Sequence, residues 1–153
     1  MPALALDIRC PNDDADAMFA ILSDFEGHPA RALGVRYVET GTDPDGRRTS
    51  SWEVDFHDGI LVWSEWDEVD AEHRTIRFAR RGGDPAEFEG AWTIAAEEQG
   101  CRIRFRATFD LGVATFASVL NPIALRALRD SMVALAASVA DGDIDVVREQ
   151  FDA

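Results

Sequence analysis

The sequence predicts an α+β fold, in which a curved antiparallel sheet of six or seven strands wraps around one long C-terminal helix. Short segments that alternate polar and apolar residues follow one another from residue 35 to residue 111, separated by turn residues. An apolar stripe at helical spacing comes after them, at Leu125, Leu128, Met132, Leu135 and Val139. One helix is too narrow to cover the whole apolar face of such a sheet, so we expect an internal cavity between the two.

The chain has the size and composition of one globular domain. It has 153 residues, of which 46% are hydrophobic and 29% are charged. We expect residues 1–153 to form a single domain, in which residues from about 142 to 153 are a further helical turn or a frayed tail. No apolar run approaches the length of a membrane span, and the N-terminus lacks the features of a signal peptide. A cytoplasmic location is therefore expected.

The charge and the reactive side chains exclude several classes of function. The net charge is −14 and all 15 basic residues are arginine, which argues against binding to nucleic acid or to an anionic membrane. The absence of lysine suggests a GC-rich coding genome. Cys10 and Cys101 fall at inward strand positions and are expected to be buried, reduced thiols. His28, His57 and His73 do not have metal-ligand spacing, and we expect no metal and no cofactor.

The first part of the chain predicts a strand and a short helix. Ala3 to Cys10 alternates as a strand does, and Pro11 ends it. Asn12 or Asp13 can cap the helix that follows. Its apolar stripe is formed by Met18, Phe19, Leu22 and Phe25, and the helix stops or bends at Gly27-His28-Pro29.

The central hairpin decides which side chains face the cavity. Ser51 to Phe56 alternates, and a turn at Asp58-Gly59 leads into Gly59 to Val69. A two-residue turn pairs His57 with Ile60, Phe56 with Leu61, Val54 with Trp63 and Trp52 with Glu65. This register turns Trp63, Glu65 and Asp67 inward, whereas a three-residue turn would turn them outward. The next hairpin, with Asp67 opposite Ile76 and Glu65 opposite Phe78, gives the same inner set.

The remaining segments complete the sheet and its cover. Phe88 to Ala96 and Cys101 to Leu111 predict two more strands, each with one apolar face. Asn121-Pro122 is a suitable helix start, because a capping residue precedes proline at the first helical position. Gly142 is a plausible end of that helix.

Two carboxyl groups inside an apolar cavity suggest acid–base chemistry. Glu65 and Asp67 are two residues apart on one strand face, so their carboxyl groups would lie about 6–7 Å apart. Burial and mutual repulsion would raise the pKa of at least one of them, and a neutral and an ionised carboxyl then form an acid and a base. Two alternatives stay open: one or both acids pair with Arg36, or they are solvated at the cavity mouth.

The other candidate site residues surround this pair. His28 precedes a proline in the loop at the expected pocket entrance, where it is a candidate general base or gate, or a surface histidine. The expected ligand-binding residues are mostly aromatic: Trp63, Trp52, Tyr37, Phe78, Phe88, Gly90, Trp92, Phe105, Leu128 and Met132. Gly90 would leave room for a ligand or mark a bulge.

The order of strand, short helices, meander and long helix resembles the helix-grip fold of START and Bet v 1-like (SRPBCC) domains. The motifs that carry the resemblance are residues 23–29, 63–69, 70–76 and Glu89-Gly90-Ala91-Trp92. Within that superfamily the chain is most similar to bacterial polyketide aromatase/cyclases. The tryptophan that opens their strand motif is Trp63 here. Their central arginine falls on Asp67, their serine on Glu65, and the aromatic before the proline on His28.

The resemblance implies an enzyme that promotes cyclisation or dehydration of a polycarbonyl small molecule in an internal apolar pocket. Glu65 and Asp67 would be its acid–base groups. The alternative is a non-catalytic binding, carrier or sequestration protein for a hydrophobic aromatic small molecule. Two protein partners stay open: an acyl carrier protein and a second copy of the chain. Carrier proteins are themselves acidic, so general electrostatic attraction to a chain of charge −14 would be small.

Overall fold

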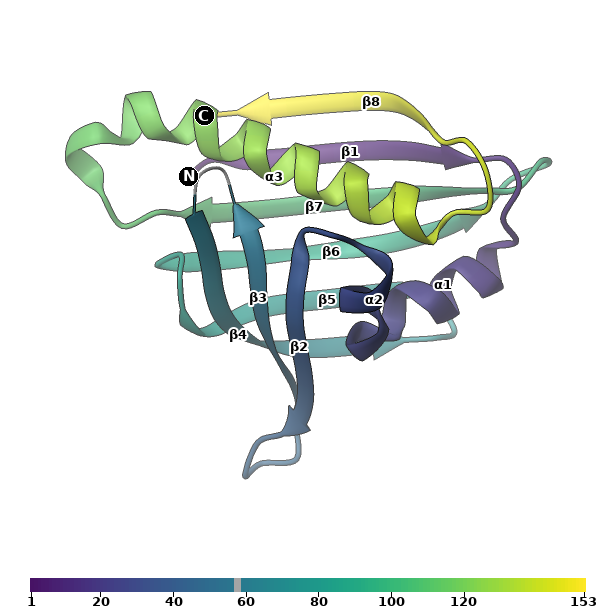
Figure 1. Ribbon diagram of the computed structural model, residues 1–153, viewed down its shortest axis with the longest axis horizontal. Coiled ribbons are helices and arrows are strands. Elements are labelled where there is room, and N and C mark those ends of the chain that lie inside the picture. Colours follow the sequence, from purple (N-terminus) through teal and green to yellow (C-terminus); the bar gives the residue numbers. More distant parts are fainter. Residues whose placement is uncertain (57–58) are drawn as a thin grey trace.

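One antiparallel sheet forms the body of the protein in the computed structural model, which describes residues 1–56 and 59–153. Within these residues the sheet has eight strands in the order β2-β3-β4-β5-β6-β7-β1-β8. Their bounds are β1 Ala3–Cys10, β2 Val35–Thr42, β3 Arg48–Phe56, β4 Gly59–Asp70, β5 Thr75–Gly83, β6 Glu87–Ala96, β7 Cys101–Asp110 and β8 Asp145–Asp152. The sheet curves around α3, Ala117–Val139, as Figure 1 shows. The predicted α+β, helix-grip arrangement is confirmed, with eight strands in place of the predicted six or seven.

Short helices follow the first strand, as predicted. They are α1, Ala15–Ser23, a 3-10 turn, Phe25–Gly27, and α2, His28–Arg31. The cap of α1 is Asp14, one residue later than expected, and its carboxylate accepts from the backbone N–H of Ala17 at 3.1 Å. The predicted apolar stripe of this helix is buried in the core. These helices close the cavity beside α3.

The register of the central hairpins differs from the prediction by two residues. Trp52 pairs with Trp63 rather than Glu65, and Asp67 pairs with Phe78 rather than Ile76. An even shift leaves every side chain on the same face of the sheet, so Trp63, Glu65 and Asp67 are buried as expected. The predicted pair of His57 and Ile60, and Asp58 of the predicted turn, lie outside the described residues.

Two elements near the C-terminus differ from the sequence prediction. Residues 145–152 form strand β8, which pairs with β1 as an edge strand, and not a helical turn or a frayed tail. Helix α3 begins at Ala117, ahead of the expected start at Asn121-Pro122, so Pro122 lies inside the helix. It ends before Gly142, which has a positive φ of 103°. The C-terminal residues thus extend the sheet on the side of β1.

The core fills most of the space between the sheet and the helices. Phe105, Ile103 and Ile8 on the sheet and Leu125 on α3 are almost completely buried. Cys10 and Cys101 are buried free thiols, directly opposite each other on β1 and β7. Among the described residues, no helix is long and apolar enough to cross a membrane.

Candidate functional site

A cavity of about 1000 Å³ lies between the sheet and α3. Strands β3 to β7 supply one wall, α3 from Pro122 to Ser138 supplies another, and the helices after β1 close a third side. Eight of the expected ligand-binding residues line it: Trp52, Trp63, Phe78, Phe88, Trp92, Phe105, Leu128 and Met132. The cavity therefore has a predominantly apolar, aromatic wall, which suits a small hydrophobic ligand.

The aromatic side chains form a continuous chain across this wall. The rings of Trp52 and Trp63 are stacked, with centroids 5.8 Å apart and an interplanar angle of 3°. Phe88 meets Trp63 edge-on at 5.7 Å and lies 4.9 Å from Phe78. Such contacts fix the rings in place, so the wall is a preformed surface for a planar or apolar ligand.

Glu65 is the acidic residue that β4 presents to this apolar wall. Only 5% of its surface is exposed, and its Oε1 accepts a hydrogen bond of 2.7 Å from the indole N–H of Trp63. Burial raises the pKa of the Glu65 carboxyl well above its usual value, and the neighbouring carboxyl of Asp67 raises it further. The hydrogen bonds from Trp63 and Ser50 oppose this shift. The Glu65 carboxyl is therefore stabilised in its neutral, proton-carrying form.

Asp67 lies next to Glu65 on the inner face of β4, in a polar network. Its Oδ2 accepts from the hydroxyl of Ser50 at 2.5 Å, and the Ser50 hydroxyl accepts from the indole N–H of Trp52 at 2.7 Å. Its Oδ1 is buried and has no other partner among the described residues. A neutral Glu65 carries the O–H that can donate to this oxygen, so the two carboxyl groups can hold one proton between them.

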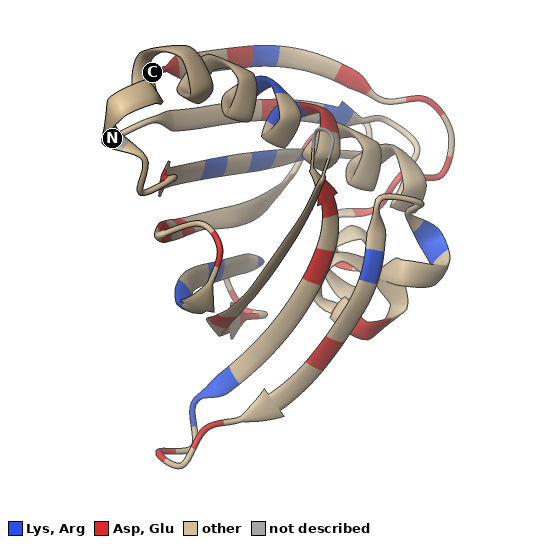
Figure 2. Ribbon diagram, turned by 60° about the vertical axis from the view of Figure 1, so that its left-hand side comes forward, with Lys and Arg blue, Asp and Glu red and all other residues tan. Residues whose placement is uncertain are grey.

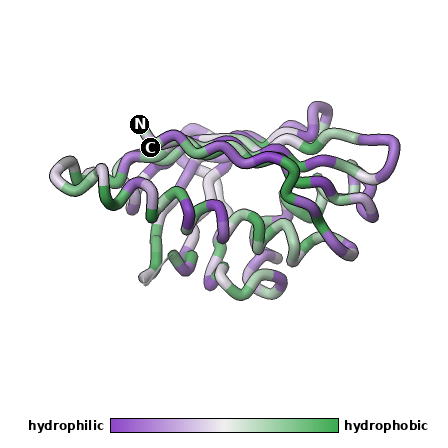
Figure 3. Tube along the Cα trace, turned by 90° about the horizontal axis from the view of Figure 1, so that it is seen from above, coloured by the Kyte–Doolittle hydropathy of each residue, from purple (hydrophilic) through white to green (hydrophobic). Residues whose placement is uncertain are grey.

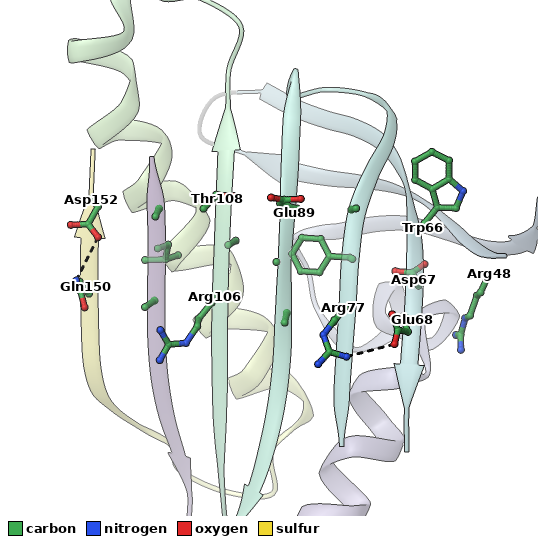
Figure 4. A pocket seen from close by; sticks show the side chains of 18 of the residues that line it. Arg48, Trp66, Asp67, Glu68, Arg77, Glu89, Arg106, Thr108, Gln150 and Asp152 are labelled. Atoms are coloured by element: carbon green, nitrogen blue, oxygen red, sulfur yellow. Dashed lines mark hydrogen bonds and ion pairs between the residues drawn. The ribbon is translucent and has the colours of Figure 1, made fainter. Parts of the chain in front are cut away.

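The cavity wall contains Glu65 but, among the described residues, neither Asp67 nor Ser50. Asp67 instead borders a shallower hollow of about 770 Å³ on the outer face of the sheet. Figure 4 shows this hollow, with Asp67 and Trp66 on one side and Arg106, Gln150 and Asp152 on the other. Glu65 is thus the member of the pair that a ligand in the cavity meets, and Asp67 lies beside it on the same face of β4, outside the cavity wall.

His28 is buried, not on the surface. It is 1% exposed and forms part of the cavity wall as the first residue of α2. Its Nε2 lies 3.0 Å from the carbonyl oxygen of Leu22, which makes Nε2 the donor and leaves Nδ1 with a lone pair. Nδ1 is buried and has no partner among the described residues. Burial lowers the pKa of His28, so the imidazole is stabilised in its neutral form.

Two of the expected ligand-binding residues lie elsewhere. Tyr37 is 45% exposed and its hydroxyl donates to Glu39, because an irregularity in β2 between Val35 and Tyr37 breaks the alternation and buries Val38 instead. Gly90 leaves no room for a ligand. A Cβ there would lie 2.1 Å from the carbonyl oxygen of Arg106 and 2.8 Å from the ring of Phe78, so the glycine allows close packing within the sheet.

The structure also decides the alternatives for the acid pair. Arg36 is on the exposed side of β2 and pairs with Asp55, so it does not neutralise Glu65 or Asp67. Ser50 was missed as a site residue, although the alternation of Trp52, Val54 and Phe56, continued back along β3, reaches it. Within the described parts of the chain, no group of three or more His, Cys, Asp or Glu side chains is arranged to hold a metal ion.

Comparisons with known proteins agree with this geometry. A family model described as polyketide cyclase/dehydrase and lipid transport matches residues 13–136. No curated protein sequence matches the chain.

Solved structures share the fold at low sequence identity. A protein from Thermus thermophilus is 21% identical with a TM-score of 0.74, over 88% of this chain and 96% of that one. The ZhuI aromatase/cyclase from a Streptomyces species is 14% identical with a TM-score of 0.76, over 90% and 91% of the two chains. A START superfamily protein from Mycobacterium smegmatis is 17% identical with a TM-score of 0.75, over 91% and 97%. With the family model covering most of the chain, this protein belongs to the polyketide cyclase/dehydrase and lipid transport family.

Proposed function

We propose that the protein is a cyclase or dehydratase that acts on a polycarbonyl, polyketide-type small molecule, with Glu65 as its proton donor and acceptor. The observation that carries the proposal is the position of this carboxyl group. It is buried in an aromatic cavity wall, it is favoured in its neutral form, and a second carboxyl beside it, that of Asp67, can share its proton. Such a pair can both supply and take back one proton without a metal ion.

The proton balance of an aldol closure followed by loss of water fits one shared proton. The pair first takes a proton from the α-carbon, which becomes the enolate that attacks the ketone. As the new C–C bond forms, Glu65 gives a proton to the ketone oxygen, so that the pair again holds one proton. In the dehydration step, Glu65 protonates the leaving hydroxyl group, which departs as water. The pair recovers a proton from the adjacent carbon as the C=C bond forms, so that no net proton is consumed.

Asp67 and His28 have supporting roles in this proposal. Asp67 is a positioning residue, because its buried Oδ1 can accept the O–H of Glu65 while its Oδ2 accepts a hydrogen bond from Ser50. His28 is a second candidate proton acceptor or gate, since its Nδ1 lone pair has no partner among the described residues. The lowered pKa of His28 makes it a weak base, so we assign the main acid–base role to Glu65.

The second candidate function is non-catalytic binding of a hydrophobic aromatic molecule, as a carrier or sequestering protein. The volume of about 1000 Å³ and the stacked tryptophans support it without requiring any chemistry from Glu65. Under this alternative the acid pair only orients a polar group of the ligand. The possible polyketide ligands are the same for both functions, so one screen serves both.

The experiment is a ligand screen followed by turnover measurements. Polyketide aromatics and shunt products are tested at pH 5 and pH 8 by thermal shift and by quenching of tryptophan fluorescence, because Trp52 and Trp63 lie in the wall. Turnover of polycarbonyl compounds that bind is then compared with that of Glu65→Gln, Asp67→Asn and the double variant. Glu68→Gln, on the exposed side of β4, is the matched control.

For an enzyme, Glu65→Gln lowers kcat by about 10²–10⁴-fold while ligand binding is kept. Full turnover in the double variant would contradict the catalytic proposal and leave the binding function. Absence of binding across the whole panel would contradict the polyketide ligand class for both.

A further inference from the structure

Cys10 and Cys101 form a buried pair of thiols that the proposed chemistry of the cavity does not use. Cys10 is the last residue of β1, Cys101 is the first residue of β7, and the two are directly opposite each other in the antiparallel ladder. Both thiols are free and 0% exposed, and they are the two cysteines of the chain. A pair placed in this way can form a disulfide within the chain, which a single buried cysteine cannot.

The register gives the two residues the separation that a disulfide needs. Directly opposed residues of antiparallel strands have Cα atoms about 4.5–5.5 Å apart, and disulfides span Cα distances of about 4.4–6.8 Å. Both side chains lie on the inner face of the sheet, as do those of Ile8 and Ile103, the preceding pair on that face. The bond can therefore form without a change in the pairing of β1 with β7.

The two thiols share a hydrogen bond, which makes them unequal in reactivity. This hydrogen bond, together with burial, raises the pKa of Cys10. The same hydrogen bond lowers the pKa of Cys101. Cys101 is therefore the thiol that ionises first, and the thiolate is the form of cysteine that attacks an oxidant.

The pair lies where the elements that cover the cavity meet. In Figure 1, β1 ends and β7 begins on the right, near the start of α1 and the end of α3. The carboxylate of Asp13 accepts from the N–H of Asp141 at 3.0 Å, which joins the connection after β1 to the connection after α3. A Cβ on Gly100 would lie 2.1 Å from the carbonyl oxygen of Cys10, so the turn before β7 packs on the same place. We call these three connections, residues 10–14, 97–101 and 140–142, the joint.

The surroundings of the joint favour a small, neutral oxidant. Figure 2 shows acidic residues in the connection between α3 and β8, and Figure 3 shows hydrophilic turns at this end of the sheet. The charge of Asp13 acts on both thiols. A negative field repels an anion such as glutathione disulfide but not hydrogen peroxide, which is neutral. Strand ends and turns open locally more easily than the centre of a sheet, which gives a small molecule access to the buried thiols.

We propose that a peroxide converts Cys10 and Cys101 to a disulfide that fastens the joint. The Cys101 thiolate attacks one oxygen of hydrogen peroxide, the O–O bond breaks, and Cys101 becomes a sulfenic acid. The hydroxide that leaves takes up the proton that the thiol had lost and becomes water. The Cys10 sulfur then attacks the sulfenic sulfur, the S–S bond forms, and the S–O bond breaks with release of a second water. Two thiols are oxidised and one peroxide is reduced to two molecules of water.

The disulfide closes a loop of about 90 residues, which contains α1, α2 and strands β2 to β6. A cross-link of this length restricts the unfolded chain and so stabilises the fold. It also fastens the connection that leads into α1 to the start of β7, so the helices that close the cavity open less often. The inference does not depend on the chemistry of Glu65, and a failure of the catalytic proposal leaves it intact.

The test treats the reduced, folded full chain with hydrogen peroxide, alkylates the remaining thiols with iodoacetamide and measures the mass. We expect a monomer that has lost two hydrogens and carries no alkyl group. Trypsin should release residues 10–31 linked to residues 82–102, and dithiothreitol should separate them. Glutathione disulfide should react at least about tenfold more slowly than peroxide at the same concentration.

The oxidised chain should also behave as a fastened structure. Its Tm should rise by about 5 °C or more, and dithiothreitol should reverse the rise. Amide hydrogen exchange should slow in α1 more than in β3, which lies away from the joint. Cys10→Ala and Cys101→Ala are the matched controls, because each leaves one thiol, which peroxide can oxidise without forming this bond or raising the Tm.

Three results of the mass measurement on wild type would overturn the proposal. They are two thiols that stay reduced, oxygen added to a cysteine without loss of two hydrogens, and a disulfide between two chains. An internal disulfide with an unchanged Tm, or with equal exchange in α1 and β3, would overturn the role of the bond in fastening the joint. Equal rates with peroxide and glutathione disulfide would contradict the choice of a neutral oxidant.

Discussion

Replacing Glu65 by glutamine should stabilise the protein at neutral pH and leave it unchanged at pH 4. Glutamine keeps the shape of the neutral carboxyl: its oxygen can accept from Trp63, and its amide can donate to Asp67. The pKa of Glu65 is raised in the folded state, so the folded protein holds a proton that the unfolded chain loses above its ordinary pKa of 4.5. Wild type therefore loses stability as pH rises above 4.5 towards the raised pKa, by about 1.4 kcal/mol per pH unit at most.

This slope sets the size of the effect. Between pH 4.5 and pH 7 the loss from one group is at most about 3 kcal/mol, and Glu65→Gln removes it. The assay is urea unfolding of wild type and Glu65→Gln from pH 4 to pH 8, followed by tryptophan fluorescence. The difference in free energy of unfolding should grow with pH, while the exposed control Glu68→Gln gives no such trend. Parallel pH profiles for Glu65→Gln and wild type would refute the reasoning, because they would show that Glu65 ionises equally easily in both states.

Three further predictions concern the surroundings of the pair. His28 has a lowered pKa in the folded state, so the free energy of unfolding should fall as pH drops below 6.5, by up to about 1.4 kcal/mol per pH unit. In urea unfolding at several pH values, His28→Gln should abolish this dependence, whereas His73→Gln should not. Ser50→Ala removes the donor to Asp67 and the acceptor of Trp52, and should cost about 1–3 kcal/mol in urea unfolding, whereas the same change at exposed Ser51 should be nearly neutral. Gly90→Ala should lower the free energy of unfolding by about 3 kcal/mol, because the new methyl group collides with backbone atoms of β7; a neutral effect would show that β6 and β7 are less tightly packed than described.

The sheet, and which side chains of each strand face the cavity, could be predicted because side chains alternate between the two faces. An error in register by an even number of residues leaves this alternation unchanged. Trp63, Glu65 and Asp67 were placed inward even though both hairpin registers were wrong by two residues. Parity fails where a strand is irregular, and this is why Tyr37 was placed in the cavity and is found outside it. Strand β8 was missed because its exposed edge position gives no apolar alternation that a sequence pattern could show.

The sequence could predict which residue types form the site, but not which of them line the cavity and which are buried beside it. Sequence spacing placed Glu65 and Asp67 together, yet only the fold shows that Glu65 lines the cavity while Asp67 is bonded to Ser50 outside the cavity wall. His28 followed a Gly in a turn-like segment, which suggested an exposed loop. Its burial comes from the packing of its ring beside Phe25 of the 3-10 turn and Trp52 of β3, and the contact with β3 is encoded by no local pattern.

The most direct test of the central claim is a carbon-13 NMR titration of the Glu65 carboxyl group, assigned with Glu65→Gln. As pH rises, the Glu65 signal should keep the chemical shift of a neutral acid to a pH well above the ordinary glutamate pKa of 4.5. Asp67→Asn removes the neighbouring charge and should bring the midpoint of the Glu65 titration down. A Glu65 carboxyl group that ionises near the ordinary pKa of 4.5 would contradict the account, because Glu65 could not then donate a proton at neutral pH.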